Sequence, residues 1–295
     1  MADADSPLFR FQLWRAALPP GLRLLLTINA VTYLAAVAFG LLSLFGVPAL
    51  RVFEWLILPA DPATVFARPW TPFTYGFTNY YLGFFGLISF GFGFWWLNWM
   101  GREFEETYGA YRLVGLYVLS ALGGAVLALL IGAAFSGADG AAFLRPYFGL
   151  WTPVTGILCA IATLHPDRGV GLFLLGVVPM KWLAVGFVVL SLVFSADLTV
   201  LGAALAGVGF ARAHRSGVDL ASWARPLFDR DRQRPAPRRD PAPTRSAPRK
   251  TAGRPAAPAA GGSRNIDEIL DKILEEGYDS LTPDERKILD QASRD

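Results

Sequence analysis

Residues 149–164 read GLWTPVTGILCAIATL and lie in the middle of the least charged part of the chain. The stretch opens with small and polar residues, continues as an uncharged apolar run, and ends at the charged turn 165–168. Polar groups at the start of a lipid-embedded helix are costly unless they hydrogen bond locally or allow close packing. A threonine can bond its own helix backbone, and a glycine lets a neighbouring helix approach. The stretch therefore predicts a membrane helix packed tightly among others.

The composition is that of a membrane protein with a polar tail. Of the 295 residues, 53% are hydrophobic and only 17% are charged, and most of the charge follows residue 211. The single cysteine, Cys159, excludes an intramolecular disulfide. With two histidines and no metal-ligand spacing, we expect no metal and no cofactor, and we expect no specific nucleic-acid partner.

Hydropathy predicts an all-α membrane domain of six transmembrane helices. Only twelve uncharged residues separate Arg168 from Lys181, about 18 Å of helix against a lipid core of about 30 Å. Val170–Met180 is therefore predicted to lead into the fifth span with a kink at Pro179, and seven spans stay open as an alternative. The predicted spans are Leu24–Gly46, Tyr80–Met100, a third between Arg112 and Asp139, 146–164, Trp182–Ala196 and 198–211.

The distribution of Lys and Arg predicts the orientation of these spans. Cytoplasmic loops of membrane proteins carry an excess of both residues. With six spans, three basic residues fall outside and nine fall inside, which places both termini in the cytoplasm and the protein in the cell membrane as a multi-pass protein. The outer residues are Arg51, Arg68 and Arg145; the inner ones are Arg10, Arg15, Arg23, Arg102, Arg112, Arg168, Lys181, Arg212 and Arg215. Trp55, Trp70 and several prolines place the connection 47–79 in the outer membrane interface.

The sequence divides into four parts. Residues 1–23 are an N-terminal cytoplasmic or interfacial segment, and 24–215 are the membrane domain. Residues 216–264 are rich in Arg, Pro and Ala and predict a disordered linker, which either contacts anionic lipid or serves as a plain tether. Residues 265–295 predict a helical hairpin, because Asn265 and the Thr282-Pro283 pair are helix-start signals and Gly277 is a stop. Its core is thin, so we expect an unidentified cytoplasmic partner.

Five motifs along residues 24–215 resemble those of rhomboid intramembrane proteases. Pro153-Val154-Thr155-Gly156 stands where that family has the Gly-X-Ser-Gly motif that opens the fourth helix. The turn 101–109 matches Gly-x-x-x-Glu-x-x-x-Gly, and 70–77 matches the start of the second helix, with Thr71 where Arg is usual. Residues 178–183 and 201–207 resemble the beginning of the fifth helix and the small-residue sixth helix. The predicted hairpin resembles a C-terminal module that follows some bacterial rhomboid-like proteins.

The resemblance implies the rhomboid fold, but the residues that the family uses for catalysis are not present here. Rhomboid proteases need a serine on the fourth helix, a histidine base on the sixth, and usually a His or Asn on the second helix for the oxyanion. The corresponding positions here are Thr155, then Val200 or Thr199, and then Ser89 and Gly93. A hydroxyl without a base in reach is a poor nucleophile, so no catalytic residues are expected.

The leading hypothesis is a pseudoprotease that binds transmembrane helices of client proteins in the gap between its second and fifth helices. One alternative is an active intramembrane endopeptidase that uses Thr155 as its nucleophile. A second alternative is an unrelated membrane scaffold or small transporter.

Two sets of small residues predict close helix contacts and a tight turn. A stripe on the last helix is expected to pack against the fourth helix near Gly156. Glu105 is expected to fix the cytoplasmic turn between the second and third helices. The stripe consists of Gly202, Ala206 and Gly209, and the turn is bounded by Gly101 and Gly109.

Overall fold

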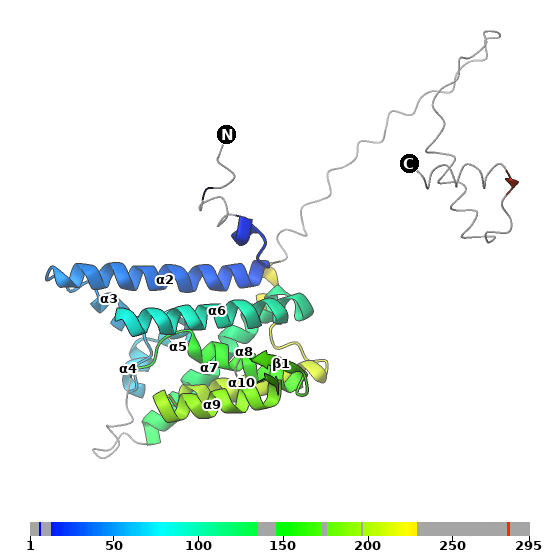
Figure 1. The fold of residues 1–295 in the computed structure, drawn as a ribbon. Coiled ribbons are helices and arrows are strands. Elements are labelled where there is room, and N and C mark those ends of the chain that lie inside the picture. The colour runs from blue at the N-terminus through cyan, green and yellow to red at the C-terminus, as the bar shows by residue number, and fades with distance from the viewer. Residues whose placement is uncertain are drawn as a thin grey trace, which may run out of the picture. The chain divides into compact units, whose positions relative to one another are not determined.

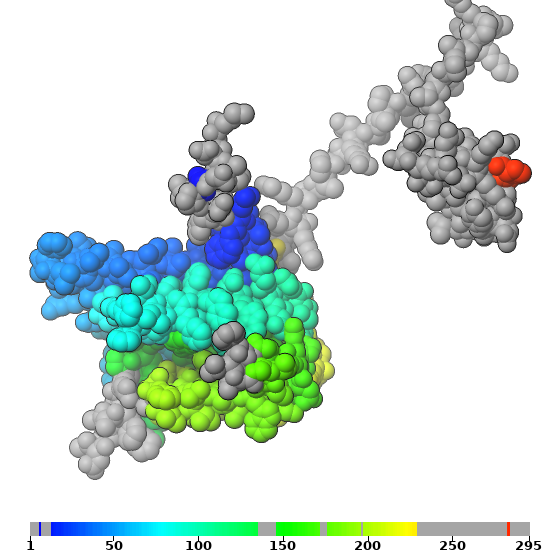
Figure 2. Space-filling model, in the orientation of Figure 1, coloured from blue at the N-terminus to red at the C-terminus, as the bar shows by residue number. Residues whose placement is uncertain are grey.

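Six helices of 14 or more residues form a bundle in the computed structural model, which describes residues 6, 13–134, 146–172, 176–195, 197–228 and 282–283. α2 and α6 lie side by side, and α9 lies on the opposite side of the bundle (Figures 1 and 2). α8 lies between these layers and packs most closely on α7 and α10. The six helices are α2 (Pro20–Leu44), α6 (Gly83–Tyr108), α7 (Ala110–Ala134), α8 (Trp151–Leu164), α9 (Met180–Ser195) and α10 (Thr199–Arg215).

The chain divides into two compact units, residues 1–235 and 236–295. Of the second unit, only residues 282–283 are described, so the predicted hairpin lies outside the described residues, as does most of the predicted linker.

The long helices expose apolar side chains on their outer faces. Phe84 and Phe85 on α6 are 72% and 83% exposed, and Val193 and Phe194 on α9 are 72% and 81% exposed. Apolar surface of this extent requires a non-aqueous neighbour. By length and hydropathy α2 and α7 qualify as membrane spans, whereas α8 and α9 are apolar but shorter. Each predicted span thus coincides with a long helix, and the bounds differ by at most eight residues, at the end of α6.

One end of the bundle carries most of its described charge, and we call it the basic end. It is where α6 ends and α7 begins, and the basic residues there are Arg23, Arg102, Arg112, Arg168, Lys181, Arg212 and Arg215. Glu105 lies there, buried at 5% exposure, and its carboxylate accepts hydrogen bonds from the backbone N–H groups of Gly21 and Leu22 at 2.8 and 2.6 Å. A side chain of α6 therefore caps the first turn of α2, whose N–H groups have no partner within their own helix.

The predicted helical lead at Val170–Met180 is wrong. β1 (Gly169–Leu172) and β2 (Gly176–Pro179) form an antiparallel pair at the basic end, with Gly169 opposite Pro179. Glycine is a poor helix former and β-branched valine favours strands, and Gly176 has a φ of +72°. Pro179 ends a strand and does not kink a helix. No described residue between α8 and α9 is helical. The seven-span alternative required a helix in this segment, so the described residues do not support it.

The connection between α2 and α6 folds into short helices. Asp61 caps one of them by accepting hydrogen bonds from the N–H groups of Ala63 and Thr64. The guanidinium of Arg68 lies 4.2 Å from the centre of the Trp55 ring. These elements are α3 (Arg51–Glu54), α4 (Pro62–Ala67), α5 (Thr71–Thr74) and η1 (Tyr75–Phe77).

The folded chain continues past α10, so the linker does not begin at residue 216. η3 (Ser222–Leu227) follows α10 and packs on α7, with Ala221 and Ala224 fully buried. Small buried alanines gave no apolar periodicity, and for this reason hydropathy placed the segment in the linker.

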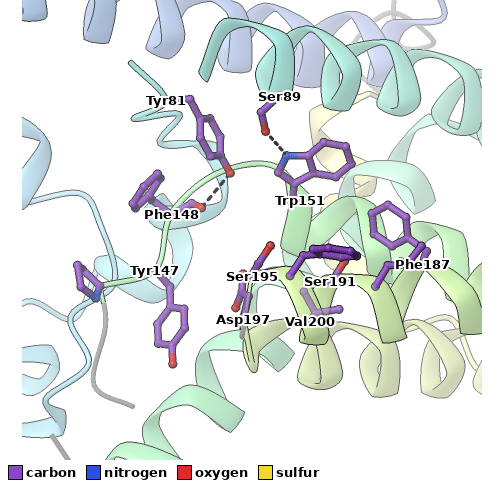
Figure 3. A pocket seen from close by; sticks show the side chains of 13 residues that line it. Tyr81, Ser89, Tyr147, Phe148, Trp151, Phe187, Ser191, Ser195, Asp197 and Val200 are labelled. Carbon is purple, nitrogen blue, oxygen red and sulfur yellow. Dashed lines mark hydrogen bonds between the residues drawn. The ribbon is translucent and has the colours of Figure 1, made fainter. Parts of the chain in front are cut away.

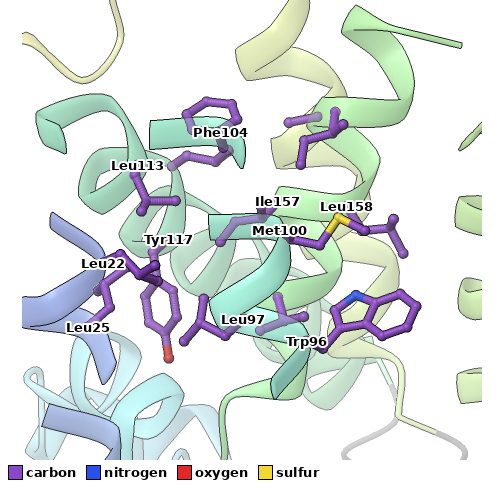
Figure 4. Packing of buried hydrophobic residues seen from close by; sticks show 14 of the residues in the cluster. Leu22, Leu25, Trp96, Leu97, Met100, Phe104, Leu113, Tyr117, Ile157 and Leu158 are labelled. Atoms are coloured by element: carbon purple, nitrogen blue, oxygen red, sulfur yellow. The ribbon is translucent and has the colours of Figure 1, made fainter. Parts of the chain in front are cut away.

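Side chains of α2, α6, α7 and α8 interdigitate in the core of the bundle (Figure 4). Met100 of α6 is fully buried in the same cluster as Ile157 and Leu158 of α8, and Leu22 of α2 joins Leu113 of α7. This packing holds α8, the helix that carries Thr155, in the centre of the bundle.

Candidate functional site

Thr155 lies inside α8 and not at its opening. The helix begins at Trp151, one turn earlier, with Pro153 in the first turn, where a missing N–H costs nothing. The Thr155 side chain is fully buried, and its hydroxyl donates a hydrogen bond of 2.8 Å to the carbonyl of Trp151. The hydroxyl proton is therefore held by the helix backbone and not by a base.

A cavity of about 450 Å³ lies beside the start of α8, at the end of the bundle opposite the basic end, which we call the cavity end. Its walls come from α6, residues 146–148, α8, α9 and the start of α10 (Figure 3). Apolar lining comes from Phe187, Leu190 and Phe194, and polar lining includes Ser191 and Asp197. Thr155 does not line this cavity.

Trp151, and not Thr155, is the α8 residue that lines the cavity. Its indole N–H donates to Oγ of Ser89 at 3.1 Å, and its ring lies 5.6 Å from Phe187 and 5.9 Å from Phe92, centre to centre (Figure 3). A Cβ placed on Gly93 would lie 3.2 Å from the Trp151 ring and 2.7 Å from Leu150. The two predicted oxyanion positions thus hold the Trp151 side chain.

The two positions predicted for the general base, Val200 and Thr199, also hold side chains with other contacts. Val200 is 2% exposed and lines the cavity with an apolar side chain. Thr199 is fully buried; its hydroxyl donates to Asp197 at 2.5 Å and lies 2.7 Å from the hydroxyl of Thr152. Asp197 also accepts the N–H of Thr199, as expected of an acidic residue just before a helix. Sequence reasoning missed this Asp197 contact, although an Asp directly before a predicted helix is a capping signal.

Both histidines of the chain lie at the basic end. Nε2 of His165 is 2.8 Å from the hydroxyl of Tyr108, and the ring of His214 packs against Tyr108 at 5.2 Å. Neither histidine is near Thr155.

The comparison with known families identifies the membrane domain. Residues 69–215 match the Rhomboid domain. The chain belongs to the rhomboid family. It is therefore an integral membrane protein, and the alternative of an unrelated scaffold or transporter is wrong. Residues 262–295 match a family described as a family of unknown function (DUF6576), and no curated protein matches the chain.

A buried polar network positions the start of α8 in the rhomboid domain. The carbonyl oxygen of the Asn79 side chain accepts the backbone N–H of Leu150 at 3.2 Å, and its amide donates to the side-chain oxygen of Asn29 at 2.8 Å. Tyr117 joins by donating to the carbonyl of Gly76 at 2.7 Å. Asn79 is fully buried. The role of Asn79 is structural, because it holds the start of α8 in place.

Glycine contacts join α7, α8 and α10 of the rhomboid domain. A Cβ on Gly156 would lie 2.0 Å from the Ser120 hydroxyl, and one on Gly202 would lie 2.2 Å from the Gly123 carbonyl. Ala206 lies against Gly123, where an added Cβ would approach it to 2.7 Å. Gly202 and Ala206 therefore meet α7, and the prediction that they pack against the fourth long helix is wrong.

Gly209 is different, because nothing lies within 4 Å of an added Cβ there, so its predicted packing role is wrong. Gly207, two residues earlier on this helix, does meet α8, because its Cβ would lie 2.1 Å from the Gly156 carbonyl.

The turn between α6 and α7 has the geometry that its motif predicts. Gly109 has a φ of +92°, which favours glycine, and it ends α6. A Cβ on Gly101 would lie 2.7 Å from the Leu22 side chain, so this glycine lets α2 approach α6. Together with the Glu105 cap, the turn attaches α2 to the rest of the rhomboid domain.

Proposed function

We propose that the chain is a rhomboid-family pseudoprotease, which binds transmembrane segments of client proteins and does not cleave them. The observation that carries this proposal is the placement of Thr155. Its hydroxyl is bonded to the Trp151 carbonyl, its side chain is fully buried, and the cavity is lined by Trp151 instead. A hydroxyl becomes a useful nucleophile only when a base accepts its proton within hydrogen-bond reach.

We further propose that all six long helices cross the cell membrane and that both termini are cytoplasmic. The alternation of helix direction supports this, because α6, α8 and α10 end at the basic end, whereas α2, α7 and α9 begin there. An excess of Arg and Lys marks the cytoplasmic side of a membrane protein. In this orientation the cavity opens in the outer half of the membrane.

The client would approach between α6 and α9. Both helices pack on α8 but make little contact with each other, and the ring pair Trp96–Phe187, 5.9 Å apart, bridges them. A cavity of about 450 Å³ is too small for a whole helix, whose diameter with side chains is about 10 Å. A client helix would therefore lie against α6 and α9 and insert side chains between them.

Photocrosslinking tests this placement directly. A photoreactive phenylalanine analogue replaces Leu190, which lines the cavity and is 56% exposed, or Leu130 on α7, which is 62% exposed. The full chain is reconstituted in lipid with a panel of model single-pass helices. We expect adducts with a subset of helices at Leu190 and none above background at Leu130. Equal adduct yields at both positions would show that the helices contact the lipid-facing surface without preference. That result would contradict a binding site between α6 and α9.

A second test separates binding from cleavage. If the helices that crosslink at Leu190 are also cut, and Thr155→Ala abolishes the cut, then the active-protease alternative replaces the proposal.

A further inference from the structure

The segment that follows α10, residues 216–228, is folded against the flank of the bundle. Gly217 has a φ of +80° and reverses the chain, and the N–H of Val218 donates to the carbonyl of Ala213. Asp219 then accepts hydrogen bonds from the hydroxyl of Tyr111 at 2.7 Å and from Arg225 at 2.8 Å. We call residues 216–228 the post-α10 segment.

Its inward side chains are small and lie close to α7. Ala221 is fully buried, and a Cβ on Gly115 of α7 would lie 2.4 Å from the Ala221 Cβ. Gly115 lies three residues after Arg112 in α7, or about 4.5 Å further along the helix. From Leu113 to Ala134 the helix carries no charge. The post-α10 segment therefore lies where the charged rim of the basic end meets the apolar belt of α7.

The segment also presents large apolar side chains outward. Four of them are between 43% and 59% exposed, although the backbone that carries them is well packed. These are Val218, Leu220, Trp223 and Leu227. Exposed side chains of this size on a docked segment require an apolar neighbour. Tryptophan is enriched where membrane lipid meets water, because its ring is apolar and its N–H is polar.

The charges of the segment suit the same location. Asp219 is paired with Arg112 at 3.2 Å and with Arg225 at 2.8 Å. Burial alone would raise the pKa of Asp219, but hydrogen bonds from Arg225 and Tyr111 lower it to about 2, so the carboxylate stays ionised and paired. The side chain of Arg225 is 49% exposed. Arg225 lies two residues after Trp223, so its charged group can stay in the headgroup region while the apolar side chains face lipid.

We propose that the post-α10 segment is a membrane-interface anchor, with Leu220, Trp223 and Leu227 inserted into the phospholipid leaflet at the basic end. The strip lies where the charged rim at Arg112 gives way to the uncharged part of α7, which is the level of lipid headgroups in a membrane domain, and this position makes lipid and not a second protein its occupant. The tail of the chain then leaves the domain at the membrane surface. This inference rests on membrane insertion of the domain and is independent of client binding.

Tryptophan quenching in nanodiscs tests the anchor with the full chain. Emission is recorded from the wild type, Trp223→Phe, and Trp96→Phe as a control, since Trp96 is 6% exposed and its ring contacts Phe187. The difference between wild type and Trp223→Phe isolates the signal of Trp223. We expect phospholipid brominated near the carbonyl to quench more than half of that signal, and aqueous acrylamide to quench little of it.

Two results would overturn the anchor. Quenching of the Trp223 signal by acrylamide alone would place the strip in water. Quenching by neither agent would mean that another protein, or a second copy of this chain, covers it. The Trp223→Phe variant keeps an apolar ring, and its melting temperature is measured to confirm that the fold is intact.

Discussion

Replacing Gly207 by alanine should destabilise the bundle, whereas the same change at Gly209 should not. Both glycines lie in α10, two residues apart. A Cβ at position 207 would lie 2.1 Å from the carbonyl oxygen of Gly156 in α8, and real Cβ contacts are not shorter than 3.0 Å. The two backbones must therefore separate by about 1 Å, in a part of the core that has little freedom to relax.

The size of the effect follows from two opposing contributions. Alanine in a helix interior is favoured over glycine by about 0.5–1 kcal/mol. Overpacking of a close helix contact costs about 1–3 kcal/mol, and more when the obstacle is backbone. We expect Gly207→Ala to lower the free energy of unfolding by about 1–2 kcal/mol. Gly209→Ala meets nothing within 4 Å, so it should leave stability unchanged or raise it by up to about 1 kcal/mol.

The chain supplies its own reporter for this comparison. Cys159 is its only cysteine and is 6% exposed in α8, so a thiol-reactive fluorogenic dye reports unfolding. Melting curves of the two variants and the wild type are recorded in the same detergent. Equal melting temperatures for Gly207→Ala and Gly209→Ala would refute the close contact between α8 and α10.

Three further predictions follow from individual contacts. Glu105→Ala leaves two N–H groups of α2 without an acceptor and should lower the free energy of unfolding by about 1–3 kcal/mol. Glu105→Gln keeps an acceptor and should lower it less. Equal dye-based melting temperatures for the two variants would refute the cap. The folded-state pKa of Asp219 is lowered to about 2, so its contribution to stability should be complete above about pH 5 and be lost as the pH falls toward 2; tryptophan fluorescence should show a weaker acid dependence in Asp219→Asn. Phe187→Ala removes the ring that bridges α6 and α9 and should increase client adducts at Leu190, and an unchanged yield would contradict entry between these helices.

The parts of the fold that depend on local hydropathy were predictable. Uncharged apolar runs gave the long helices with bounds that differ by at most eight residues, since each helix must offer an apolar face to lipid or core. The β-hairpin before α9 was missed because an apolar run of about ten residues has the same hydropathy in a helix as in strands. Its glycines and valines were the available signal.

The site depended on contacts that no local pattern encodes. The sequence placed Thr155 correctly on the fourth long helix, but it did not give the hydrogen bond from its hydroxyl to the Trp151 carbonyl. Gly202 and Gly209 looked alike in a small-residue stripe, yet only one of them meets another helix. Which face of α10 turns toward α8 is decided by the packing of all the helices together. Likewise, the use of Ser89 and Gly93 to hold Trp151 follows from side-chain positions on two distant segments.

The most direct test of a non-cleaving rhomboid protein is a turnover assay on the full chain in lipid. The wild type, Thr155→Ala and Thr155→Ser are incubated with a panel of model transmembrane substrates and, separately, with a fluorophosphonate probe that labels activated hydroxyls. Because the hydroxyl is bonded to the Trp151 carbonyl and both histidines lie at the other end of the bundle, we predict no cleavage and no labelling by any of the three proteins. Cleavage or labelling by the wild type that Thr155→Ala abolishes would contradict the account and establish Thr155 as a nucleophile.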